Sequence, residues 1–201
     1  IHDLDTRHRL NEEGVAEGFR QLEEGQGFRA LADLKSQGEI KAIGAGINFP
    51  GFVPRFVERF DMDYFLYAGP YTLLDQPGLD DDMPLCVENN IGIILGGVFA
   101  SGILATGAVD GALYRYVDAE PEVMEKVKKI TAICASHGVE LSAAALQFPM
   151  HHPAVASVIP GANNPDQVAS NYAQATTDIP DDLWAELKHE ECLLRDAPTP
   201  G

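Results

Sequence analysis

The first five residues, IHDLD, place a histidine where an apolar strand gives way to a polar loop. Ile1 has the character of the last residue of a buried strand, and His2 lies at the start of the loop. Histidine changes charge near neutral pH and often transfers protons in enzymes, so His2 is a catalytic candidate, although taken alone a solvated histidine is the simpler interpretation. With Asp3, Asp5 and His8 it forms a set of possible metal ligands, but their spacing matches no common metal-binding motif. We therefore predict no metal site.

Glycines follow most of the apolar segments that we predict to be strands. Such glycines favour a ligand site at the carboxyl edge of a parallel sheet. They are Gly44, Gly46, Gly69, Gly96, Gly97 and Gly161. The sequence contains no GxGxxG, GxxxxGK[ST] or GxSxG motif, which argues against a Rossmann site, a P-loop and a serine hydrolase. His151 and His152 lack the i, i+4 spacing of helical metal ligands, and we predict a solvated helix end there.

Apolar segments alternate with segments of helical period, which predicts an α/β fold with a parallel sheet. The predicted strands lie around Ile1 and at 40–45, 64–68, 92–95 and 155–160. The predicted helices lie at 28–38, 50–60, 79–90, 119–138, 141–153, 164–175 and 180–193. Because IGIIL and FLYAG are apolar throughout, we expect burial on both faces of the sheet.

The number of strands decides whether the sheet can close into a barrel. A closed (β/α) barrel needs eight strands and about 250 residues, whereas we count about five strands in 201 residues. The alternative is a doubly wound sheet. Five strands leave an open sheet edge, and a missing N-terminal segment or a second copy of the chain could cover it. We treat residues 1–201 as a single domain.

The charge and the cysteines limit the possible partners and the location. The net charge of −17 argues against nucleic acid and anionic membranes as partners. Three widely spaced cysteines form no disulfide or zinc pattern, which fits a reducing cytoplasm. Residues 91–109 carry no charge, but they contain five glycines and have acidic or neutral flanks. We therefore predict a strand and a glycine-rich loop there rather than a membrane span.

Five runs, taken in order, resemble the aldo-keto reductase superfamily. They are HDLD, ALADLKSQGEIKAIGAGIN, YTLLDQ, GGVFASGILATG and SVIPGANNPDQVASN. The details are most similar to the branch of sugar and pyridoxal dehydrogenases. The resemblance implies a TIM-type (β/α)8 barrel, of which this chain holds about the last five βα units, starting at what looks like the fourth strand.

The resemblance also implies a reaction and a role for His2. The family transfers a hydride between a nicotinamide and a carbonyl or alcohol, here a sugar hemiacetal, an aldehyde or an alcohol. In the family a histidine orients the substrate carbonyl, and His2 is its counterpart. The acid–base tyrosine, its lysine and an aspartate belong to earlier strands. The alternatives are a catalytically incomplete fragment or pseudo-enzyme acting as a binding or structural half-barrel, and an unrelated half-barrel isomerase or phosphate-binding protein.

The cofactor contacts implied by the resemblance fall into three groups. Asn48 corresponds to the residue that holds the nicotinamide carboxamide, while Ile47 replaces the usual serine, Ala68 the usual glutamine and Gly96 the stacking tyrosine. The loop that includes Ser101, Gly102 and Ile103 would bind the pyrophosphate through backbone amides and the serine hydroxyl. The adenosine would contact Gly161, Asn163, Gln167 and Asn171.

The predicted adenosine loop also indicates which cofactor is preferred. Family members that prefer NADP carry a lysine or arginine there, and Gln167 occupies the position of that arginine. No lysine or arginine occurs between Ile130 and Leu187. Because a 2′-phosphate without a nearby cation would be poorly held by an acidic protein, we expect NAD rather than NADP.

Overall fold

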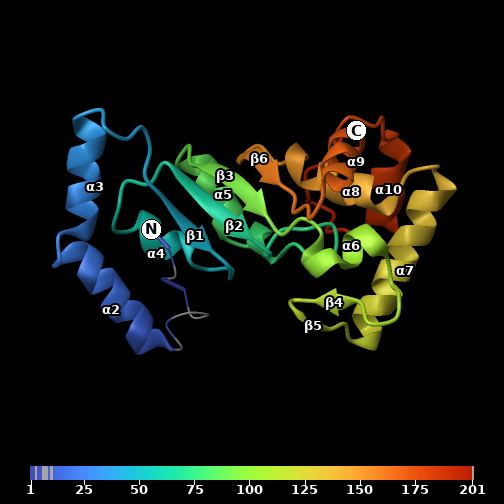
Figure 1. Ribbon diagram of the computed structural model, residues 1–201, viewed down its shortest axis with the longest axis horizontal. Helices are drawn as coiled ribbons and strands as arrows, with labels where there is room; N and C mark the ends of the chain where they lie inside the picture. Colours follow the sequence, from blue (N-terminus) through green and yellow to red (C-terminus); the bar gives the residue numbers. More distant parts are fainter. Residues whose placement is uncertain (3, 6–8, 10, 201) are drawn as a thin grey trace.

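A parallel sheet of four strands lies at the centre of the computed structural model, which describes residues 1–2, 4–5, 9 and 11–200 (Figure 1). The strands are β1 (Gly44–Ile47), β2 (Tyr64–Ala68), β3 (Gly92–Gly96) and β6 (Val155–Ile159), in the order β1-β2-β3-β6. All neighbouring pairs are parallel, so the four carboxyl ends lie at one edge of the sheet. The predicted α/β class is confirmed.

Helices connect the strands and extend beyond both ends of the sheet (Figure 1). They are α2 (Glu12–Glu23), α3 (Gly27–Ser36), α4 (Val53–Val57), α5 (Asp82–Glu88), α6 (Ile103–Thr106), α7 (Pro121–Ser136), α8 (Leu141–Gln147), α9 (Pro165–Ala175) and α10 (Asp181–His189). A small antiparallel hairpin consists of β4 (Leu113–Tyr114) and β5 (Val117–Asp118). Each predicted helix overlaps an observed one, while α2, α6 and the hairpin were not predicted.

Two predicted strands differ from the observed ones. The strand expected at 40–45 begins only at Gly44. No strand is present around Ile1 among the described residues, although Ile1 bonds to β1: its N-terminal ammonium group donates to Gly44 O at 2.7 Å, and its carbonyl accepts from Gly46 N at 2.9 Å. These are the bonds of a parallel neighbour, but Leu4 and Asp5 already turn into the core.

The segment 91–109 forms β3, a short 3₁₀ turn (Ala100–Gly102) and the four-residue helix α6. The strand was predicted, whereas the 3₁₀ turn and α6 lie in the part that was predicted to be a glycine-rich loop. Among the residues that the structure describes, no helix is both long enough and apolar enough to span a bilayer. All three cysteines are buried free thiols, and burial raises the pKa of Cys86 to about 12.

The two faces of the sheet are buried to different extents. Phe65, Tyr67, Ile93 and Leu95 alternate along β2 and β3, and each is fully buried in the core beneath the helices. Their neighbours on the opposite face, such as Leu66, are only half-buried. The expectation of burial on both faces is therefore wrong for the described residues, because the helices cover only one face.

An aromatic cluster attaches α2 and α3 to the first βα unit. Phe19 of α2 lies 5.0 Å from Phe56 of α4, and Phe28 of α3 stacks 4.4 Å from Phe60. Phe56 in turn meets Phe65 of β2 edge-on at 5.7 Å. Packing of this kind, worth about 0.5–1.5 kcal/mol per pair beyond burial, gives the N-terminal helices a fixed position beside β1.

A buried carboxylate ties the loop after β1 to β2. Asp82, 1% exposed, accepts hydrogen bonds from the Tyr67 hydroxyl at 2.6 Å and from the N–H groups of Gly51 at 2.8 Å and Val53 at 3.2 Å. Burial raises the pKa of Asp82, and burial together with the carboxylate raises that of Tyr67. The three donors compensate for the removal of the carboxylate from water.

We expect Tyr67→Phe to lower the free energy of unfolding by about 2 kcal/mol, because the buried Asp82 carboxylate would lose its shortest hydrogen bond. Urea denaturation followed by circular dichroism measures the change. Tyr172→Phe is the matched control, since Tyr172 is 74% exposed. Equal stability of Tyr67→Phe and the wild type would show that the hydrogen bond contributes nothing.

Candidate functional site

The predicted site residues follow the strands at the carboxyl edge of the sheet. Ala68 pairs with Gly96, and Gly96 with Ile159, so these residues form one row across β2, β3 and β6. Asn48 follows the last residue of β1, and Gly161 lies two residues beyond the end of β6. With about 4.8 Å between neighbouring strands, this row spans about 10 Å, and the four strands from β1 to β6 span about 14 Å, which suits an elongated ligand.

His2 lies against the half-buried face of β1. A Cβ atom on Gly46 would be 3.3 Å from Cδ2 of the His2 ring and 3.7 Å from Nε2, so a glycine at this position lets the imidazole approach the backbone. His2 itself is exposed. Because side chains alternate along a strand, Gly46 and Asn48 belong to the same face, and Ile47 points into the core, where it is buried. His2 and Asn48 thus share the half-buried face of the sheet.

Asn48 is held by Asp5. The Asp5 Oδ2 atom accepts from the backbone N–H of Asn48 at 2.9 Å and from its side-chain Nδ2 at 2.7 Å. Asp5 is only 1% exposed. The sequence suggested Asp5 only as a possible metal ligand, and its pairing with Asn48 was not predicted. The position of Asp5 in the HDLD run, three residues after His2, was the one available signal.

Small residues line the row between Asn48 and Gly161. A Cβ atom on Gly96 would lie 3.5 Å from the Ala68 Cβ and 3.9 Å from the Ile159 side chain. No bulky side chain therefore arises from β2 or β3 at this level. Gly97 has a φ of 70°, a backbone conformation that favours glycine, while a Cβ atom there would make only an ordinary contact with Gly69 N at 3.5 Å. Ala68 and Gly96 therefore leave an open floor between Asn48 and the Ile159 side chain.

The loop predicted to bind pyrophosphate, which includes residues 101–103, makes a tight turn. Ser101 has a φ of 64° and Gly102 a φ of 102°, while Ile103 begins α6. The Gly102 N–H group donates to Phe99 O at 2.8 Å, so this amide is already used within the loop. The Ser101 hydroxyl accepts from Tyr116 N at 3.1 Å. The predicted roles of these residues stay predictions.

The hairpin that contacts Ser101 is strained at its tip. Arg115 and Tyr116 both have a positive φ, 52° and 66°, although neither is glycine. Asp75, in the loop after β2, holds the hairpin: its Oδ2 accepts from the Tyr114 hydroxyl at 2.5 Å and pairs with the Arg115 guanidinium at 2.9 Å. Burial and the neighbouring carboxylate raise the pKa of Tyr114 to about 12. The hairpin is thereby linked to two loops at the carboxyl edge.

The predicted adenosine residues form a second group, at the start of α9. Asn164 caps this helix by accepting from Gln167 N at 2.9 Å. Gln167 Oε1 accepts from Asn163 N at 2.6 Å, and Asn171 Nδ2 donates to Gly161 O at 3.3 Å. The structure therefore brings these four predicted residues together. They lie beside β6, at the opposite end of the strand order from Asn48.

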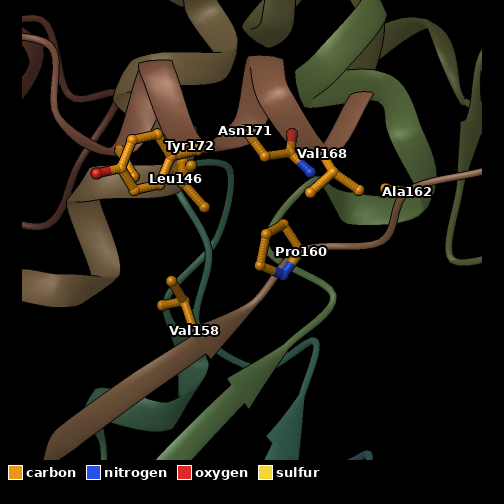
Figure 2. Close-up of a pocket in the computed structure, with 8 residues that line it drawn as sticks. Leu146, Val158, Pro160, Ala162, Val168, Asn171 and Tyr172 are labelled. Atoms are coloured by element: carbon orange, nitrogen blue, oxygen red, sulfur yellow. The ribbon is translucent and has the colours of Figure 1, made fainter. Parts of the chain in front are cut away.

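An open apolar hollow of about 250 Å³ lies between β6, α8 and α9 (Figure 2). Val158 and Pro160 line it from the strand side, and Leu146 and Tyr172 from the helices. Asn171 is among the lining residues, so the hollow adjoins the predicted adenosine group. Its remaining lining residues are Ala162, Val168 and Ala175.

His152 contradicts the expectation of a solvated helix end. The side chain is 5% exposed, meets the Tyr71 ring edge-on at 5.5 Å, and accepts from Ala154 N at 3.2 Å through Nδ1. Burial lowers the pKa of His152 to about 4. His151 is half-buried beside Trp184, and burial lowers its pKa as well. The chain turns inward here because the 3₁₀ turn Phe148–His151 packs on the core rather than projecting from it.

The possible metal-ligand set of His2, Asp3, Asp5 and His8 lies only partly within the residues that the structure describes. No cluster of three or more candidate ligands occurs within 1–2, 4–5, 9 and 11–200. Asp3 and His8 lie outside the described residues.

Comparison with known proteins identifies the class that this fold and site define. The model of the aldo/keto reductase family matches residues 1–190, and the chain belongs to this family. It is 37% identical over 172 residues to pyridoxal 4-dehydrogenase of Microbacterium luteolum and 39% identical over 175 residues to D-threo-aldose 1-dehydrogenase of a Pseudomonas species. Each match covers 86% of this chain.

Two solved structures have a fold similar to that of this chain. An aldo-keto reductase of Bacillus halodurans in its holo form matches with a TM-score of 0.63 at 22% identity, covering 80% of this chain and 54% of that one. Glycerol dehydrogenase of Gluconobacter oxydans matches with a TM-score of 0.64 at 18% identity, covering 85% and 54%. The predicted TIM-barrel type is confirmed, with four strands of the barrel in the described residues. The chain spans about half the length of the curated relatives it matches.

Proposed function

We propose that the chain is part of an NAD-linked oxidoreductase that oxidises a sugar hemiacetal or a related alcohol, or reduces the corresponding carbonyl. The observation that carries the proposal is the row of Asn48, Ala68 and Gly96 at the carboxyl edge, with His2 on the same face. The names of the two curated relatives, D-threo-aldose 1-dehydrogenase and pyridoxal 4-dehydrogenase, support this substrate range.

The residues of the row fit a nicotinamide ring. Gly96 has no side chain and Ala68 only a methyl group, so a planar ring can approach the sheet edge closely. Asn48 adds a polar group beside this floor. When bound, a nicotinamide supplies the hydride chemistry. The part of this chain is to bind and orient: the exposed His2 ring can hydrogen-bond to a substrate oxygen above the same face.

The residues that we expect to contact the adenosine of the cofactor favour NAD over NADP. The Gln167 side chain has its Oε1 bonded to Asn163 N, so Nε2 is the group that it can offer to a ligand as a donor. A neutral amide donor suits a ribose hydroxyl, whereas a 2′-phosphate would meet no lysine or arginine between positions 130 and 187. The net charge of −17 adds long-range repulsion against the extra phosphate.

Calorimetry with NAD on the purified protein tests the proposal. We expect saturable binding with a dissociation constant of about 1 mM or below. Turnover is followed in parallel with aldoses and pyridoxal as substrates. By resemblance to the family, the acid–base tyrosine, its lysine and the aspartate precede His2, so binding is the primary measurement. Binding without turnover would support the alternative of a binding half-barrel, and no binding by the folded protein would refute both.

A further inference from the structure

Asp5 controls which atom of Asn48 faces a ligand. We propose that Asp5 is a positioning residue that holds the side-chain amide of Asn48 in one orientation, with the amide oxygen available to accept a hydrogen bond. The site therefore selects a pyridine nucleotide that carries a carboxamide over one that carries a carboxylate. The inference rests on the proposed function, since it concerns the same nicotinamide end of the site.

The orientation of the Asn48 amide follows from two hydrogen bonds to one oxygen atom. Asp5 Oδ2 accepts from the backbone N–H of Asn48 at 2.9 Å and from Nδ2 at 2.7 Å. A carboxylate can only accept, and the backbone N–H can only donate. Turning the amide over would set its carbonyl oxygen against Oδ2 and replace a hydrogen bond with a repulsion. Burial of Asp5, 1% exposed, strengthens this preference because water screens the contact little.

The fixed orientation leaves Oδ1 of Asn48 as the atom offered to a ligand. Within the described part of the chain, no group donates to this oxygen. Asn48 is half-buried and belongs to the face of β1 against which His2 lies. A ligand on that face therefore meets a hydrogen-bond acceptor, with the Asp5 carboxylate directly behind it.

This acceptor discriminates between two closely related ligands. The carboxamide of NAD carries N–H donors that can bond to Oδ1 of Asn48. Nicotinic acid adenine dinucleotide has a carboxylate in its place, which offers no donor and adds a negative charge near Asp5. The site would leave that carboxylate unpaired, and a buried charge without a partner lowers affinity. We therefore expect NAD to bind about tenfold or more tightly than the acid analogue.

A variant pair separates this role from a purely structural one. In Asp5→Ala, no acceptor remains to hold Nδ2 of Asn48, so the amide can adopt either orientation and the selectivity should disappear. Asp63→Ala is the matched control. Asp63 Oδ2 accepts from Ile43 N at 2.7 Å, next to the start of β1, so this carboxylate anchors the same strand at its opposite end. Loss of either anchor can destabilise the protein, but only Asp5→Ala should change the choice of ligand.

The experiment measures by calorimetry the ratio of dissociation constants for the acid analogue and NAD. We expect a ratio of about ten or more for the wild type and for Asp63→Ala, falling to about one for Asp5→Ala. An unchanged ratio in Asp5→Ala, an equal change in Asp63→Ala, or a wild-type ratio near one would overturn the inference while leaving NAD binding intact. If the wild type binds neither nucleotide, the proposed function itself fails. Should Asp5→Ala not fold, Asp5→Ser, whose single hydroxyl oxygen can donate or accept, replaces it.

Discussion

Replacement of Gln167 by arginine should raise the affinity for NADP about 10- to 100-fold, while the affinity for NAD changes less than about threefold. The expected gain corresponds to one charge-assisted interaction, about 1.5–3 kcal/mol. Calorimetric titration with both nucleotides measures the two affinities.

The effect follows from the position and the chemistry of Gln167. The residue lies in the first turn of α9 (Pro165–Ala175), where its side chain bonds to Asn163 N and the helix is capped by Asn164. A guanidinium can bind a 2′-phosphate through two parallel hydrogen bonds, which an amide cannot match in charge. No lysine or arginine between positions 130 and 187 already serves this purpose.

Gln21→Arg is the control for the added charge alone. Gln21 is exposed on α2, at the far end of the molecule from α9 (Figure 1). We expect this variant to bind NADP as the wild type does. If Gln21→Arg gains as much affinity as Gln167→Arg, net charge rather than local pairing controls the preference. Tight NADP binding by the wild type would contradict the predicted NAD preference directly.

Lowering the pH should destabilise the protein because His152 is buried in its neutral form. This residue contributes about 3 kcal/mol to the free energy of unfolding at neutral pH, and acidification removes that contribution. Burial lowers the pKa of this imidazole to about 4 in the folded state, against about 6.5 in an unfolded chain. Between these values the unfolded chain binds a proton that the folded protein excludes. The stability is therefore fully present above about pH 6.5 and is lost as the pH falls toward 4.

Urea denaturation of the wild type and of His152→Asn at several pH values measures this contribution. The asparagine oxygen can still accept from Ala154 N, as Nδ1 of His152 does at 3.2 Å. We expect the variant to lose less stability than the wild type between pH 7 and pH 5. His189→Gln, on an exposed residue at the end of α10, should behave as the wild type does. Parallel curves for the wild type and His152→Asn would show that His152 does not contribute.

Local sequence signals predicted most of the elements. Helix α7 begins after Glu120 with Pro121 and ends near Gly138, which has a φ of 69°. These residues act within one turn of the chain, so the sequence alone reveals them. The hairpin of β4 and β5 escaped prediction because its turn residues, Arg115 and Tyr116, are not those that favour a positive φ.

Burial of individual polar residues could not be predicted in the same way. His152, Asp82 and Asp5 are 5%, 1% and 1% exposed, although each residue type is commonly found at the surface. Their partners are distant in the sequence: Asp82 bonds to Gly51 and Tyr67, and Asp5 to Asn48. No pattern of neighbouring residues indicates contacts between residues that are so far apart in the sequence.

The sequence by itself determined the alternation of strands and helices, the family, and the residues that follow each strand, because these depend on neighbours in the chain and on recognisable motifs. Only the tertiary structure decided that the helices bury one face of the sheet, that His2 lies over Gly46, and that Asp5 orients Asn48. These arrangements depend on side chains brought together from separate loops, where packing and hydrogen bonding across the fold select one geometry.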